Sequence, residues 1–99
     1  MIIVIGSVTV SADGLADALR LSQEHVDRSR LEPGCISHDI YQDAEDPRRL
    51  AFVERWETMA ALEQHFQVPE SGLFITTIAD LATVAPAINL YESSAIVRH

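Results

Sequence analysis

The apolar positions along the chain recur with two periods, one typical of β-strands and the other typical of amphipathic helices. Segments rich in β-branched and other apolar residues predict four strands, over residues 2–10, 35–42, 50–57 and 87–97. After the first strand, a helical period predicts one buried stripe, formed by Leu15, Leu19, Ser22 and Val26. We expect Ser11 to cap this helix at its start, and Pro33 and Gly34 to end it.

Two helical segments precede the last strand. Thr58 is a capping residue for a short helix, whose buried face is predicted to comprise Met59, Leu62 and Phe66. Pro69 interrupts the pattern, and a further helix is predicted over roughly residues 72–83. The resulting order is β-α-β-β-α-β, which is typical of the ferredoxin-like α+β class. We therefore expect one domain over residues 1–99, with a four-stranded antiparallel sheet and helices on one face.

The first strand is apolar on both of its faces. Ile3 and Ile5 lie on one face, whereas Val4 and Val8 lie on the other. Because the helices can cover only one face of the sheet, the other face needs a second protein surface. Two copies of the chain could pack sheet against sheet, about 10 Å apart. We therefore expect a homodimer.

The charge of the chain argues against two classes of partner. Its 99 residues contain 15 acidic side chains against 7 basic ones, all of them arginines, and the net charge is −8. Such a surface repels the phosphates of nucleic acids and the anionic headgroups of membranes, so we expect neither as a partner. The apolar stretch at residues 78–90 is too short and too polar to span a membrane.

The chain has a single cysteine, Cys35, which cannot form an internal disulfide, and its amino terminus does not resemble a secretion signal. Both features favour a cytoplasmic location. Strand alternation places Cys35 on the face opposite to His38, and we interpret it as a small buried residue. The pairs His38/Asp39 and His65/Glu63 do not converge at these spacings, so no metal site is expected.

Two histidines are candidates for acid–base chemistry. His38 lies between Ile36 and Ile40 on a strand face that we expect to be buried. It is either a substrate-binding or acid–base residue, or a structural histidine held by a hydrogen bond. His65 lies beside the apolar face of the short helix, so it is either a general base that faces a cavity or a helix-end histidine satisfied by water or a carboxylate.

The third strand carries an aromatic face. Trp56 shares its parity with Phe52 and Glu54, and it is either a wall for a planar ligand or a core anchor. Glu54 on this face is either paired with an arginine or a carboxyl group with a raised pKa. Arg55 has the opposite parity, and we expect it at the dimer interface.

Four short segments occur in a recognisable order: EPGC at 32–35, YQDAEDP at 41–47, FVERWET at 52–58 and ALEQHF at 61–66. Together they resemble the antibiotic biosynthesis monooxygenase superfamily, and in particular its small quinol monooxygenase-like proteins. The resemblance covers nearly the whole chain. It implies a dimeric α+β barrel with a pocket in each subunit between the sheet and the helices.

The resemblance also implies a function, namely cofactor-independent oxidation of a small quinol or polycyclic phenol by O2. His65 or His38 would then be the catalytic base. The residues expected to bind the aromatic substrate are Trp56, Phe52, Phe66 and Phe74. We expect His65 to face a cavity with Trp56, Phe66 and Phe74 in its wall. A non-catalytic small-ligand-binding or accessory protein, and an isomerase or decarboxylase acting on a small metabolite, remain alternatives.

Haem-degrading relatives use an asparagine in the first strand, a tryptophan on the short helix and a later histidine. This chain has Gly6 and Ser7 in the first-strand region and His65 where that tryptophan would fall, and the next histidine is His99. Haem is therefore not expected, because no axial ligand can be assigned. We expect no cofactor.

Overall fold

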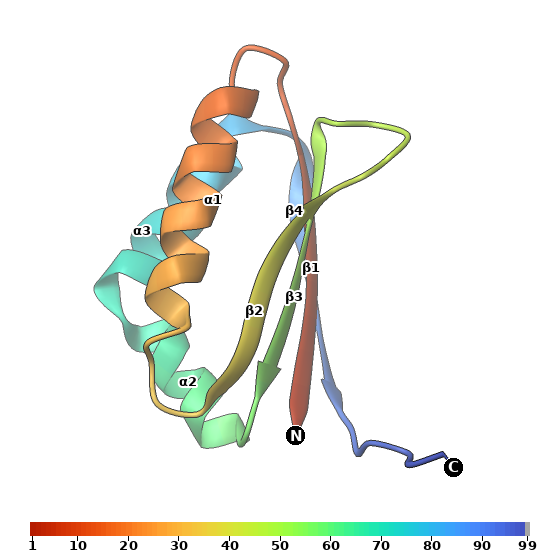
Figure 1. The fold of residues 1–99 in the computed structure, drawn as a ribbon. Helices are drawn as coiled ribbons and strands as arrows, with labels where there is room; N and C mark the ends of the chain where they lie inside the picture. The colour runs from red at the N-terminus through yellow and green to blue at the C-terminus, as the bar shows by residue number, and fades with distance from the viewer. Residues whose placement is uncertain (99) are drawn as a thin grey trace.

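The computed structural model describes residues 1–98 and contains one sheet with three helices (Figure 1). In chain order the elements are β1 (Ile2–Val10), α1 (Leu15–Ser29), β2 (Cys35–Gln42), β3 (Arg49–Trp56), α2 (Met59–Gln67), α3 (Pro69–Leu81) and β4 (Ala82–Glu92). The strand order in the sheet is β2-β3-β1-β4, and all neighbouring pairs are antiparallel. The ferredoxin-like α+β fold predicted from the sequence is confirmed.

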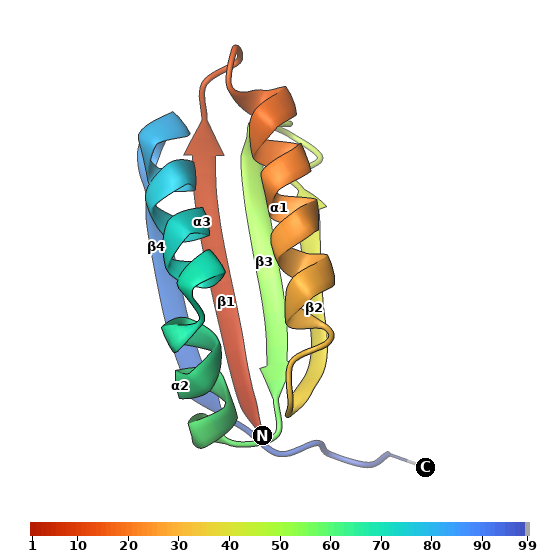
Figure 2. The same ribbon diagram turned by 90° about the vertical axis from the view of Figure 1, so that its left-hand side faces the viewer.

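All three helices lie on the same face of the sheet (Figures 1 and 2). Seen from the helix side, α1 lies in front of β3 and β2, while α2 and α3 lie over β1 and β4 (Figure 2). The opposite face has no helix over it (Figure 1). None of the helices in the described part of the chain is long and apolar enough to cross a membrane.

The buried face of β1 contributes to two hydrophobic clusters, one near each end of the strand. Val8 and Val10 pack in one buried cluster, together with Ala18 and Val26 of α1. A second cluster contains Ile2, Val4, Trp56 and Leu62. Between Val4 and Val8, the position that would face the helices is Gly6. It has no side chain, and this leaves space over the middle of the sheet.

Two predicted boundaries differ from the structure. The helix α1 begins after Gly14, and the Ser11 hydroxyl accepts a hydrogen bond from the Gly14 amide, 3.0 Å away, so it caps a turn ahead of the helix. The helix α3 begins at Pro69, because a proline in the first helical turn lacks only an N–H that would have no partner within the helix.

The last strand follows α3 directly and covers residues 82–92 instead of 87–97. Pro86 does not end the strand, because the pairing of β4 with β1 is irregular near that position and β4 lies at the edge of the sheet.

The buried face of α2 also differs from the prediction. Met59 is 39% exposed, whereas Leu62 and His65 are buried. Side chains on a helix point back toward its amino end, so Met59, the first residue of α2, projects beyond the helix. The predicted cap is confirmed, since the Thr58 hydroxyl accepts a hydrogen bond from the Ala61 amide at 3.1 Å.

A β-bulge alters the parity of β2. Cys35 pairs with Trp56 and Ser37 with Arg55, so Ile36 is an extra residue between two regular pairs. Ile36 is 51% exposed, and Cys35 packs at the edge of the second core cluster. The predictions that Ile36 shares the buried face of His38, and that Cys35 faces away from it, are therefore wrong.

Candidate functional site

A cavity of about 130 Å³ lies between the middle of the sheet and the helices. Its apolar wall includes Phe52 of β3, Phe66 of α2 and Phe74 of α3. Gly6 lines its floor, which is the place where β1 has no side chain to fill the space. Its polar groups come from five elements and comprise Ser7, His25, His38, Glu54 and His65.

Three histidines from different elements meet at this cavity. His25 comes from α1, His38 from β2 and His65 from α2, and their exposed fractions are 5%, 1% and 3%. One ring nitrogen from each lies within 4.8 Å of the others. The two histidines proposed as bases are therefore neighbours, with ring centroids 5.9 Å apart, and a third imidazole accompanies them.

His65 is oriented by a carboxylate. Its Nδ1 lies 2.8 Å from Oε1 of Glu32, in the turn between α1 and β2. A neutral imidazole in this position donates its Nδ1 proton to the carboxylate, so the Nε2 atom carries the lone pair. Of the two interpretations of His65 from the sequence, the hydrogen bond to a carboxylate is therefore observed. The ring also lines the cavity, as the other interpretation requires.

The turn that carries Glu32 lies close against α2. Gly34 has φ of 83°, and a Cβ atom at this position would lie 2.5 Å from the Cβ of Ala61. Only glycine combines this backbone conformation with so close an approach. Gly34 thereby allows the α1–β2 turn to reach the helix on which His65 lies.

His25 is held in the opposite tautomer. Nη2 of Arg28 donates a hydrogen bond to Nδ1 of His25 at 3.0 Å, so the neutral ring carries its proton on Nε2. The ring stacks on Phe74, with centroids 4.1 Å apart and an interplanar angle of 7°. Burial, followed by the neighbouring imidazoles and Arg28, lowers the pKa of His25 from 6.5 to about 3.

His38 is more deeply buried than His25 and has fewer hydrogen bonds. Neither of its ring nitrogens has a hydrogen-bond partner among residues 1–98. Its Nε2 lies 3.6 Å from Oε2 of Glu54. Burial, followed by His65 and Arg30, lowers the pKa of His38 from 6.5 to about 3. The structural hydrogen bond considered from the sequence is therefore absent from the described part of the chain.

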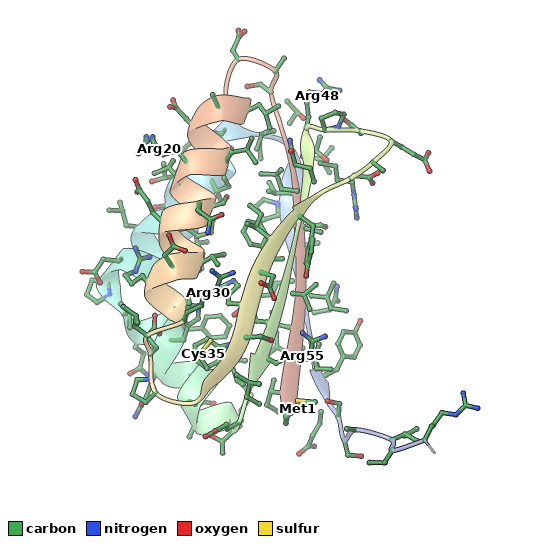
Figure 3. The ribbon with its side chains drawn as sticks, in the orientation of Figure 1. Met1, Arg20, Arg30, Cys35, Arg48 and Arg55 are labelled. Carbon is green, nitrogen blue, oxygen red and sulfur yellow. The ribbon has the colours of Figure 1, made fainter. Side chains whose placement is uncertain are left out.

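Glu54 completes the polar side of the cavity. Its Oε1 accepts a hydrogen bond from Nε1 of Trp56 at 3.0 Å and lies 3.8 Å from Nε2 of His65. Burial raises the pKa of Glu54, and the hydrogen bond from Trp56 opposes this rise. The sequence suggested either an arginine partner or a raised pKa for Glu54, and the structure supports the raised pKa. Arg55 lies on the other face of the sheet, where it donates to the hydroxyl of Ser37 (Figure 3).

The aromatic residues divide into two groups. Phe52, Phe66 and Phe74 line the cavity, as the resemblance implied. Trp56 does not belong to the lining residues and lies behind His65, with ring centroids 4.8 Å apart, inside the second core cluster. The structure thus places Trp56 one layer behind the cavity wall in which the sequence analysis expected it.

His25 is a residue of this cavity that was not predicted from the sequence. The signal was present, because His25 lies three residues after Ser22 and therefore on the buried stripe of α1. The three histidines are separated by 13 and 27 positions in the sequence (25 to 38 and 38 to 65) and come together only in the folded chain, so no local spacing rule for metal ligands identifies them.

Comparison with known proteins places the chain in a family. The family model for antibiotic biosynthesis monooxygenases matches residues 1–76. An uncharacterised protein of Synechocystis is 36% identical over 91 residues, which cover 92% of this chain and 62% of that protein. The chain therefore spans less than two thirds of that relative's length.

Solved structures share the fold over nearly the whole chain. The crystal structure of an antibiotic biosynthesis monooxygenase superposes with a TM-score of 0.88 at 25% identity, covering 96% of this chain and 100% of that one. A Deinococcus radiodurans protein superposes with a TM-score of 0.93 at 23% identity, covering 100% of this chain and 98% of that one. With the family model matching most of its length, the chain belongs to the antibiotic biosynthesis monooxygenase family.

Proposed function

We propose that the protein is a cofactor-independent monooxygenase that oxidises a small quinol or polycyclic phenol with O2. The observation that carries the proposal is the pair His65–Glu32, which directs the Nε2 lone pair of a buried imidazole away from the carboxylate at Nδ1. That ring lines an aromatic-walled cavity with Phe52 and Phe74. Family membership supports oxygenase chemistry in this cavity.

The proposed reaction begins with a proton transfer. Nε2 of His65 accepts the proton of a bound quinol hydroxyl, while Glu32 holds the ring and stabilises the imidazolium that forms. The resulting anion is electron-rich enough to reduce O2 without a flavin or a metal. In the net reaction, one quinol and one O2 give one hydroxyquinone and one water, and the quinol supplies all the electrons.

The other polar groups of the cavity would act on the charges that develop. The neutral His25 ring, with its proton on Nε2, can donate a hydrogen bond to an anionic oxygen of the substrate. The phenyl rings of Phe52, Phe66 and Phe74 would pack on the planar substrate and exclude water from the reactive intermediate.

The direct test is oxygen uptake with menadiol-type quinols, corrected for their spontaneous oxidation. We expect the wild-type protein to consume oxygen at least about 10²-fold faster than a His38→Ala/His65→Ala double variant, because a positioned base contributes about that much. Equal rates for the two proteins would rule out the proposal. Saturable quenching of Trp56 fluorescence by a quinone, without any oxygen uptake, would instead favour the small-ligand-binding alternative.

We also propose that the working unit is a homodimer. The sheet face without helices carries partly exposed apolar side chains, among them Ile5 and Tyr91, which are about half exposed in the single chain. Arg55 and Tyr41 lie on the same face. A second copy packed on this face would bury these groups and leave both cavities on the outer sides of the paired sheets.

A further inference from the structure

The convergence of His25, His38 and His65 has chemical consequences beyond acid–base chemistry. Three imidazoles are a common set of protein ligands for zinc and related ions. One nitrogen from each ring lies within 4.8 Å of the others. Nitrogens that share one ion at about 2.0–2.1 Å must lie somewhat closer together, a change that small rotations of the rings can supply.

The unpaired nitrogens of His38 favour a bound ion at this place. The ring is 1% exposed, and neither nitrogen has a hydrogen-bond partner among the residues that the structure describes. A buried polar atom without a partner is costly, and an unseen ion or water is a usual explanation. A cation between the three rings would accept one of these lone pairs.

The groups around the rings match the usual surroundings of metal ligands. Glu32 binds Nδ1 of His65 at 2.8 Å, the carboxylate–histidine arrangement that orients a ligand and raises its basicity. Glu54 lies 3.6 Å from Nε2 of His38 and 3.8 Å from Nε2 of His65, so its carboxylate is a candidate fourth ligand. Trp56 donates a hydrogen bond to that carboxylate, and such a bond orients a carboxylate that ligates a metal.

One contact opposes metal binding and provides a test of it. Nη2 of Arg28 donates to Nδ1 of His25, which keeps the proton of that ring on Nε2. A metal bound at Nε2 requires this proton to move to Nδ1 and the guanidinium to turn away. Arg28 also brings a positive charge close to the ion. If the three histidines bind a metal, removal of the Arg28 side-chain charge should therefore strengthen binding.

We infer that His25, His38 and His65 bind one divalent transition-metal ion, with Zn²⁺ or Co²⁺ as representative ions, and that the ion inhibits the enzyme by occupying the Nε2 lone pair of His65. The inhibitory part rests on the proposed function, because it supposes that this lone pair is the base. Imidazole ligands favour such ions over Mg²⁺ and Ca²⁺, which prefer oxygen ligands.

The binding test uses full-length, metal-free protein without an affinity tag. Titration with Co²⁺ should give saturable visible absorption bands at one ion per chain, and Zn²⁺ should abolish them by competition. The variants His25→Gln and His38→Gln should each weaken Co²⁺ binding at least 10-fold, and Glu32→Gln should weaken it by about 10-fold to 100-fold. Arg28→Gln should bind Co²⁺ more tightly than the wild type.

The matched control is Glu63→Gln, an exposed carboxylate on the same helix as His65, which should bind Co²⁺ like the wild type. Circular dichroism establishes that each variant is folded. Should His25→Gln fail to fold, Arg28→Gln and Glu32→Gln still test the site with opposite expected signs. The metal site is wrong if no saturable Co²⁺ band forms, or if these variants bind Co²⁺ as the control does.

Oxygen uptake in the presence of Zn²⁺ tests inhibition separately. We expect uptake to fall with the same Zn²⁺ dependence that competition against Co²⁺ gives, and to return on chelation. If oxygen uptake is undiminished at saturating Zn²⁺, the ion does not inhibit the enzyme. This result does not contradict the metal-binding site itself. Absence of quinol oxidation in metal-free protein overturns the proposed function, and with it the inhibitory role, while the Co²⁺ titration still decides whether the site exists.

Discussion

Glu32 and His65 lie 33 residues apart in the sequence, yet Oε1 of the carboxylate lies 2.8 Å from Nδ1 of the imidazole. The turn after α1 and the helix after β3 form this pair together. A carboxylate at Nδ1 fixes both the tautomer and the direction of a histidine ring. The relationship therefore gives His65 a defined orientation in the cavity, which an isolated buried imidazole would lack.

The first prediction concerns this orientation. Glu32→Ala should lower kcat for quinol oxidation by about 10-fold or more, because the ring loses the acceptor that aligns it and stabilises its protonated form. KM should change little, since Glu32 is not a cavity-lining residue. Glu63→Ala, on the exposed side of α2, is the control and should keep the wild-type kcat. An unchanged kcat in Glu32→Ala would mean that the carboxylate has no part in orienting the base.

The second prediction separates the two candidate bases. His65→Gln should reduce oxygen uptake by about 10²-fold, the usual contribution of a positioned base, while His38→Gln should reduce it less. The reason is that only His65 has a carboxylate partner at its second nitrogen. Glutamine retains most of the side-chain volume, which matters because His65 is buried and packs against Trp56. A larger loss in His38→Gln would assign the base to His38.

The third prediction concerns the buried contact between Trp56 and Glu54. Trp56→Phe removes the N–H that Oε1 of Glu54 accepts and should lower the free energy of unfolding by about 1–3 kcal/mol, with a further loss from the smaller side chain. Denaturant unfolding measures the effect. In a Glu54→Gln background the same substitution should cost less, because the buried carboxylate is gone. Equal costs in both backgrounds would show that the negative charge of Glu54 adds nothing to the hydrogen bond from Trp56.

The fourth prediction concerns the reactivity of Cys35. Burial, followed by the nearby carboxylates of Glu54 and Glu32, raises the pKa of its thiol above 9.0, while Arg30 opposes this rise. At pH 8 the thiol is therefore protonated, and alkylation by iodoacetamide should be slow. The midpoint of the alkylation rate against pH should lie above 9.0 in the folded protein and near the ordinary thiol value after unfolding. Arg30→Gln should move the midpoint in the folded protein upward, and a downward movement would contradict this assignment.

The fifth prediction concerns the proposed homodimer. The temperature of unfolding should rise with protein concentration, because dissociation accompanies unfolding of an obligate dimer. Ile5→Glu, on the sheet face without helices, should yield monomers in sedimentation experiments. Met59→Glu is the matched control, since Met59 is 39% exposed and Ile5 is 46% exposed, but Met59 lies on α2. A folded wild-type monomer at nanomolar concentration would overturn the proposed dimer.

The elements that follow from local patterns could be predicted from the sequence. Thr58 caps α2 because its hydroxyl satisfies an amide three residues later, which is a local rule. The alternation in β1 places Val4 and Val8 on one face of the strand for a similar reason, and the structure shows that this face is the buried one. Both depend on residues within a few positions of one another, so a single sequence contains the necessary information.

The parts of the site that depend on distant contacts could not be predicted. The contact of Glu32 with His65 requires the α1–β2 turn to lie against α2, and nothing near either residue in the sequence indicates this. Trp56 was expected at the cavity, but its indole N–H finds a partner in Glu54, and the ring packs in the core. The helical period could have placed His25 on the buried face of α1, but it could not have shown that His25 meets His38 and His65.

The extra residue Ile36 divides β2 into two stretches that should tolerate length changes differently during evolution. A residue gained or lost before Ile36 changes the turn that follows α1, which carries Glu32 and Gly34, but it does not change the face on which His38 lies. A residue gained or lost between His38 and Gln42 would rotate His38 to the opposite face of the sheet, because side chains alternate along a strand. Among relatives that keep this histidine at the cavity, the number of residues between it and the β2–β3 hairpin should therefore be constant. The number of residues between it and the first helix should vary more.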